Sequence, residues 1–203
     1  MGSPERITHI SQSKAVLIDV DNTINKLQAH LFKYVNRRSI QTYLYRQFTS
    51  AQMESTDTPF DKLAEEYFGF PELVIQSRPF PKALEGTKLL HENGFELHIA
   101  SARHESLYPT TLAWLEKHGF LSYVTDVHRR TPHISGTDFK RGVAKKINAA
   151  TAFDDEKLLA DALASIGIPV YLIRRPWNIE LKRSDLIRPH SSFYRAALSF
   201  LNS

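Results

Sequence analysis

The sequence contains no cysteine among its 203 residues. That absence excludes disulfide bonds, thiolate nucleophiles, iron–sulfur clusters and zinc sites built on cysteine. No apolar run is long enough to span a bilayer, which excludes a transmembrane helix. The first residues are polar and lack an apolar segment, so we expect no secretory signal and a cytoplasmic protein with no membrane partner.

The net charge of the chain is also small. The chain has 26 Lys and Arg against 22 Asp and Glu, a net charge of +4. This weak excess favours small anionic partners, whereas proteins that wrap nucleic acid carry far more positive charge. The 42% of hydrophobic residues is typical of a globular protein, and the length suits one medium domain that carries a small insert.

Short apolar runs alternate with helical patterns along most of the chain. Such runs are typical of strands buried on both faces of a parallel sheet. The alternation predicts an α/β fold with a doubly wound, mostly parallel, Rossmann-like sheet. The predicted strands lie at 14–19, 95–100, 123–127, 150–153 and 170–173, and the predicted helices at 81–93, 108–118, 139–148 and 156–166.

Residues 25–79 interrupt the alternation, because they contain no convincing strand and have helical spacing of aromatic and aliphatic residues. We therefore divide the chain into an α/β core, 14–24 and 80–203, and a helical cap insert at 25–79 that follows the first strand. The insert would cover the carboxyl ends of the strands, where open α/β sheets bind ligands. Most of its aromatic residues are expected to form its own core; they are Phe32, Tyr34, Tyr43, Tyr45, Phe48, Phe60, Tyr67, Phe68 and Phe70.

Polar side chains follow several predicted strands directly and are therefore expected to meet at one edge of the sheet. Carboxylates gathered there would repel one another, and an oxygen-bound divalent cation, Mg²⁺, would relieve that repulsion. A hydroxyl and two cations beside the ion would suit a phosphate group. The candidate residues are Asp19, Asp21, Ser101, Arg103, Lys140, Asp154 and Asp155, with Lys140 expected to open its helix.

The segment Asp19-Val20-Asp21-Asn22-Thr23, followed in order by Ser101, Lys140 and Asp154-Asp155, resembles the four motifs of the haloacid dehalogenase-like phosphohydrolases. The resemblance covers nearly the whole chain from Lys14 onward. It implies a Mg²⁺-dependent phosphatase that forms an aspartyl-phosphate.

The resemblance also implies a role for each motif residue. Asp19 would be the nucleophile and a metal ligand. Asp21 would act as the general acid and base, and its backbone carbonyl would bind the metal. Ser101 and Lys140 would hold the phosphoryl oxygens, and Thr23 would hydrogen-bond within the first loop. Asp155 aligns best with the direct metal ligand, and Asp154 with a ligand acting through water or a neighbouring group.

Arg103 has two open roles: it could bind the phosphate or clamp its loop to an acid. Three parts of the sequence resemble 5′(3′)-deoxyribonucleotidases: the segment 101–103 followed by 110–119, Arg78–Pro81, and the Pro-Trp-Asn at 176–178. A small phosphomonoester, in particular a (deoxy)nucleoside monophosphate, is therefore the expected substrate. A polynucleotide 3′-phosphatase and a non-catalytic binding protein of the same fold are the alternatives, and a homodimer is compatible with the sequence.

Two further groups of residues carry no predicted role. The basic residues near the C-terminus are interpreted as a solvated face. The nine histidines show no metal-binding spacing along the chain, so most are assigned to the surface or to helix ends. The basic group consists of Arg174, Arg175, Lys182, Arg183 and Arg188.

Overall fold

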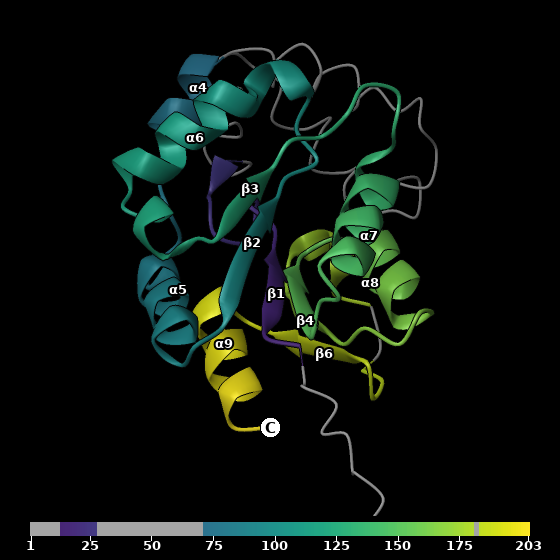
Figure 1. Cartoon of the computed structure of the whole chain (residues 1–203). Coiled ribbons are helices and arrows are strands. Elements are labelled where there is room, and N and C mark those ends of the chain that lie inside the picture. The colour runs from purple at the N-terminus through teal and green to yellow at the C-terminus, as the bar shows by residue number, and fades with distance from the viewer. Residues whose placement is uncertain (1–12, 28–70, 181–182) are drawn as a thin grey trace, which may run out of the picture.

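A computed structural model describes residues 13–27, 71–180 and 183–203 (Figure 1). Its centre is a six-stranded sheet in which every neighbouring pair of strands is parallel. The strand order is β3-β2-β1-β4-β5-β6. The strands are β1 (Ala15–Ile18), β2 (Glu96–Ala100), β3 (Asp126–His128), β4 (Thr151–Asp154), β5 (Val170–Ile173) and β6 (Ile187–His190).

Helices cover both faces of this sheet, with α5 and α9 on one side and α7 and α8 on the other (Figure 1). None of the helices in the described ranges is long and apolar enough to cross a membrane. The helices are α4 (Pro71–Gln76), α5 (Ala83–Glu92), α6 (Tyr108–Lys117), α7 (Gly136–Lys146), α8 (Lys157–Ala164) and α9 (Phe193–Leu201), and the 3₁₀ turns are η2 (Glu105–Leu107), η3 (Leu121–Tyr123) and η4 (Pro176–Asn178).

Alternate residues of the buried strands face the two helical layers. In β1, Val16 and Ile18 pack with residues of α5, α6 and α9, whereas Leu17 packs with residues of α7 and α8. This alternation follows from the two-residue period of a strand. It explains why β1 is apolar throughout, since all four of its residues are buried. The predicted doubly wound sheet is therefore confirmed.

The five predicted strands are all present, but the sequence interpretation missed β6 and α9. β6 contains Pro189 and lies at the edge of the described sheet, where a residue without an N–H is tolerated. Its sequence Ile-Arg-Pro-His lacks the apolar run on which the other strands were recognised. α9 begins after Ser192, whose side chain accepts a hydrogen bond from the Arg195 amide at 3.3 Å.

The start of α7 also differs from its prediction. The Ser135 side chain caps the helix by accepting a hydrogen bond from the Asp138 amide at 3.0 Å, and the helix begins at Gly136 rather than at Phe139. Lys140 consequently lies in the second turn, so the expectation that it opens its helix is wrong. Its inward orientation comes instead from sharing the buried face of the helix with Val143 and Ala144.

The two ends of the predicted insert lie side by side at the top of β1. Asn25 forms an antiparallel bridge with Pro79, and the Phe80 amide donates to the Ile24 carbonyl at 2.8 Å. The intervening chain thus leaves and returns at one point. Residues 28–70, including the nine aromatic residues of the insert, lie outside the described residues. α4 is the described helix of the insert, and the indole of Trp114 in α6 donates to the Ser77 carbonyl just after it, at 2.8 Å.

Candidate active site

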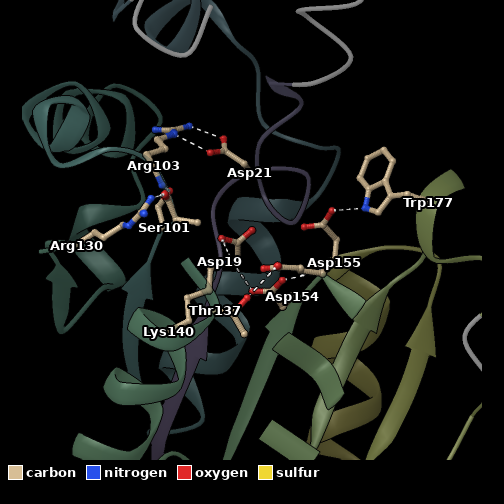
Figure 2. A network of polar contacts seen from close by, with 12 residues as sticks. Asp19, Asp21, Ser101, Arg103, Arg130, Thr137, Lys140, Asp154, Asp155 and Trp177 are labelled. Atoms are coloured by element: carbon tan, nitrogen blue, oxygen red, sulfur yellow. Dashed lines mark hydrogen bonds and ion pairs between the residues drawn. The ribbon is translucent and has the colours of Figure 1, made fainter. Parts of the chain in front are cut away.

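Three aspartates meet where the order of the strands reverses. β1 and β4 are neighbours although long segments separate them in the chain, and the Asp19 amide donates to the Phe153 carbonyl at 3.0 Å. Asp19 directly follows β1, Asp154 ends β4, and Asp155 follows it. One carboxylate oxygen of each lies within 4.8 Å of the others, and all three residues are buried (Figure 2). The predicted meeting of acidic side chains is therefore observed.

Lys140 holds two of these carboxylates from the side of α7. Its Nζ lies 2.8 Å from Asp19 Oδ1 and 2.8 Å from Asp154 Oδ2. Burial alone would lower the pKa of Lys140, but Asp154 and Asp19 outweigh burial and raise it well above its ordinary value. The ammonium therefore stays charged at the base of the site. Charge-assisted contacts of this length fix its position.

The acid–base state of Asp19 reflects the same crowding. Burial raises the pKa of its carboxyl from 3.8 to about 8; Asp154 and Asp21 add to the rise, and Lys140 opposes it. Burial also raises the pKa of Asp155 well above its ordinary value, with Asp154 and Asp19 contributing in the same direction. One lysine thus does not balance the negative charge that the three aspartates bring together.

Residues of the turn η4 bind both the side chain and the backbone of Asp155. The indole Nε1 of Trp177 donates to Asp155 Oδ2 at 3.0 Å (Figure 2). The side-chain Nδ2 of Asn178 donates to the Asp155 carbonyl at 2.7 Å and to the Ile173 carbonyl at 2.9 Å. The other carboxylate oxygen of Asp155 accepts no hydrogen bond from the described part of the chain. By contrast, Asp154 uses one oxygen for Lys140 and the other for the Glu156 amide at 2.8 Å.

These residues fit a hard divalent cation. Three buried carboxylates within 4.8 Å supply the oxygen donors that Mg²⁺ prefers. Burial first, and then the neighbouring carboxylates, raise the pKa values of Asp19 and Asp155, and a bound cation would favour their ionised forms. Asp19 and Asp155 are better placed than Asp154 to bind an ion directly, because both oxygens of Asp154 already accept hydrogen bonds.

Asp21 lies apart from this cluster and is paired with Arg103. The Arg103 Nε donates to Asp21 Oδ2 at 2.8 Å, and its Nη2 donates to Oδ1 at 2.6 Å. The third contact of this guanidinium, from Nη1, is to the Thr111 hydroxyl at 2.9 Å. Of the two roles that the sequence left open for Arg103, the structure shows the clamp to an acid (Figure 2).

Ser101 directly follows β2 and begins the next loop, where its hydroxyl accepts a hydrogen bond from the Arg103 backbone amide at 3.3 Å (Figure 2). Sequence reasoning did not single out Arg130, which lines the same pocket as Ser101. Its Nη1 donates to the Ala102 carbonyl at 2.6 Å, and its Nε donates to the Ile134 carbonyl at 2.8 Å. Arg130 thus ties the chain after β3 to the loop that carries Ser101. The hydrogen bond expected of Thr23 within the first loop is not observed, because the Thr23 hydroxyl is buried without a partner among the described residues.

The C-terminal basic residues are not uniformly a solvated face, and here the sequence interpretation was wrong for Arg175. Its Nε donates to the Asn22 carbonyl at 2.7 Å, and its guanidinium lies over the Phe80 ring at 4.2 Å. Arg188 donates to the Tyr171 hydroxyl at 2.7 Å. Arg175 therefore binds the loop after β1, which carries Asp19 and Asp21, to the turn that carries Trp177.

Comparison with known proteins identifies the fold. No protein-family model matches the sequence, and no curated protein matches it. A predicted phosphatase from Clostridium acetobutylicum superposes with a TM-score of 0.68 at 15% identity, covering 95% of this chain and 100% of that one. CbbY from Rhodobacter sphaeroides, in complex with phosphate, gives 0.60 at 14% identity, covering 92% and 99%. The haloacid dehalogenase-type hydrolase YfnB from Bacillus subtilis, bound to magnesium, gives 0.61 at 16%, covering 95% and 100%.

The chain therefore has the α/β fold of the haloacid dehalogenase-like hydrolases and phosphatases, as the motif resemblance implied. At these identities the structural similarity establishes the fold alone.

Proposed function

We propose that the protein is a Mg²⁺-dependent phosphomonoester hydrolase that forms an aspartyl-phosphate on Asp19. One observation carries this proposal: the Asp19 carboxylate lies with those of Asp154 and Asp155 within 4.8 Å and is held by Lys140 at 2.8 Å. A bound Mg²⁺ supplies positive charge next to the carboxylates and to the phosphoryl oxygens.

The side chains of this chain perform the covalent step. An oxygen of ionised Asp19 attacks phosphorus, and the bond from phosphorus to the ester oxygen breaks. Lys140 counters the charge on Asp19 before the attack and on the phosphoryl oxygens during it. The Ser101 hydroxyl donates to a phosphoryl oxygen. A water molecule then attacks the aspartyl-phosphate, which releases phosphate and restores Asp19.

Asp21 protonates the leaving oxygen and later accepts a proton from the attacking water. In this structure both of its oxygens accept hydrogen bonds from Arg103, at 2.8 and 2.6 Å. A carboxylate held in this way does not face the ester oxygen, so its role requires the pair with Arg103 to open. Arg103 is then free to contact the phosphate, which reconciles the two roles that the sequence left open.

We further propose a (deoxy)nucleoside 5′-monophosphate as the substrate. Support comes from the resemblance of the segments at 101–103 and 176–178 to those of nucleotidases. The proposal is also supported by the contacts of the second segment, in which Trp177 and Asn178 both bind Asp155. CbbY, one of the structural neighbours, has been solved with xylulose-1,5-bisphosphate, which favours small phosphate esters for sites of this kind.

Phosphate release tests both levels of the proposal. The panel contains nucleoside 5′- and 3′-monophosphates, a sugar phosphate and a 3′-phosphorylated oligonucleotide, each with Mg²⁺ and with EDTA. We expect Mg²⁺-dependent release from the mononucleotides. Release from the oligonucleotide alone would replace the nucleotidase with the polynucleotide 3′-phosphatase. No release from any ester would favour a binding protein.

The Asp19→Asn variant tests the covalent mechanism separately from the substrate. We expect it to lose turnover by about 10³-fold or more, as other covalent nucleophiles do. Asp161→Asn is the matched control, because Asp161 is exposed on α8. Intact protein stopped in acid during turnover should gain the mass of one phosphoryl group, and Asp19→Asn should not. Near-normal turnover of Asp19→Asn would refute the mechanism.

A further inference from the structure

Three potential metal ligands lie together on two neighbouring strands, away from the carboxylate cluster. His98 is in β2, and Asp126 and His128 are in β3. His98 is the register partner of Asp126, and His128 lies two residues further, so all three side chains project from the same face of the sheet. One ligand atom from each lies within 4.8 Å of the others.

The two imidazoles have a spacing that suits one metal ion. His98 Nδ1 lies 3.1 Å from His128 Nε2, and the ring centres are 5.3 Å apart. Two imidazole nitrogens on a tetrahedral zinc ion, each about 2.0–2.1 Å from it, lie about 3.3 Å apart with ring centres about 5.2 Å apart. In the present structure the two nitrogens share a hydrogen bond. If the donor ring carries its proton on its other nitrogen instead, both rings stay neutral, and a turn of the rings would aim two lone pairs at an ion between them.

The surrounding charges favour a cation. The Asp126 carboxylate lies 3.6 Å from His128 Nδ1, and Glu96 acts on His98 from the same strand. Lys146 of α7 opposes a cation at His128, but two carboxylates exceed one ammonium. Burial lowers the pKa of both imidazoles more than these carboxylates raise it. Both rings are therefore neutral near pH 7, which is the form that binds metals.

We propose that His98, His128 and Asp126 form a binding site for a transition-metal ion of the zinc class. Imidazole nitrogen selects such ions over Mg²⁺, whereas the oxygen-only cluster at Asp19 has the opposite preference. The ion would join β2 to the three-residue strand β3. Arg130, two residues beyond His128, holds the Ala102 carbonyl, so the ion would also steady the loop next to Ser101.

The histidines were not recognised from the sequence because their spacing is not local. They are thirty positions apart, and only the pairing of β2 with β3 brings them together. The proposal is independent of the phosphatase activity, since none of its residues belongs to the carboxylate site.

Metal titration of the full-length protein, first stripped with EDTA, tests the proposal. The starting protein is Asp155→Asn, which disables the carboxylate cluster as a competing site. We expect one Zn²⁺ per chain by calorimetry, and Co²⁺ should give the visible absorption bands of nitrogen ligation. His98→Gln and His128→Gln, made in the same background, should each weaken Zn²⁺ binding by about 100-fold. His91→Gln is the matched control, since His91 is exposed on α5.

A second readout covers variants that fold poorly. In the unmutated ligand set, Zn²⁺ should shift the imidazole ¹⁵N resonances of two histidines and no others, and Mg²⁺ should shift neither. Absence of Zn²⁺ binding, or equal affinity in the His98→Gln and His91→Gln proteins, would overturn the proposal. The pair would then be a hydrogen bond between strands and nothing more.

Discussion

Replacement of Asp19 by Asn tests the electrostatic account of the site without any substrate. The buried Asp19 carboxyl has its pKa raised from 3.8 to about 8 in the folded, metal-free protein. Asn has nearly the same shape but no titrating group. The variant therefore removes a proton-binding group while leaving the packing almost unchanged.

The sign and size of the effect follow from linkage. Between pH 3.8 and about 8 the folded state holds a proton on Asp19 that the unfolded chain has lost. The stabilisation is therefore complete below pH 3.8 and is lost as the pH rises toward 8. The free energy of unfolding falls by about 1.4 kcal/mol per pH unit, or about 2.7 kcal/mol between pH 5 and pH 7, from this carboxyl alone.

Urea denaturation at pH 5, 6 and 7 in EDTA measures this slope. Asp155 and Glu156 also have raised pKa values through burial, so both proteins should lose stability with rising pH. The wild type should lose more than Asp19→Asn, by about 2.7 kcal/mol across the range. Mg²⁺ should flatten the wild-type slope, because a bound cation favours the ionised carboxylates. The exposed-site variant Asp161→Asn should behave like the wild type.

Equal slopes for the wild type and Asp19→Asn would refute the reasoning. So would a wild-type protein that gains stability between pH 5 and pH 7 in EDTA. Either result would mean that Asp19 is already ionised in the metal-free protein.

Three further substitutions test the surroundings of the site. Gly136→Ala places a Cβ 2.6 Å from that of Ala102, so the free energy of unfolding in urea should drop by about 1–3 kcal/mol. Adding Ala102→Gly should restore it. The control Gly142→Ala, where an added Cβ meets no other atom, should stabilise the protein slightly. Lys140→Met leaves Asp19 and Asp154 without their cation, and should cost about 3–5 kcal/mol at pH 8 but less at pH 5, where Asp19 carries a proton; equal losses would contradict this. Trp177→Phe removes the donor to Asp155 and should weaken Mg²⁺ affinity in calorimetry about 10- to 100-fold, and an unchanged affinity would rule out that role.

Local patterns were sufficient to predict most of the α/β core. β1, β2 and β4 each have an acidic or hydroxyl residue at or just after their carboxyl end, so the residues that gather at one sheet edge can be identified one strand at a time. Asp19, Asp154 and Asp155 were predicted in this way, because the geometry of parallel strands sends every strand end to the same side. β6 was missed because a proline-containing edge strand lacks that pattern.

Contacts between distant segments were decided only by the tertiary structure. The sequence named Arg103, but the fold determined that its guanidinium binds Asp21 rather than standing free. Arg175 was interpreted as part of a solvated basic group, yet in the fold its guanidinium donates to the Asn22 carbonyl. His98 and His128 likewise meet only through the pairing of β2 with β3.

There is a physical reason why local sequence patterns predict the elements but not the contacts between them. Burial and backbone periodicity act over a few neighbouring residues, so the order of residue types along the chain is enough to predict a strand, a helix or an acidic strand end. Which side chains then touch depends on the order of the strands and on the path of the loops between them. A polar side chain such as that of arginine or histidine forms hydrogen bonds with whichever partner the packed sheet brings within about 3 Å. No short stretch of sequence specifies that partner.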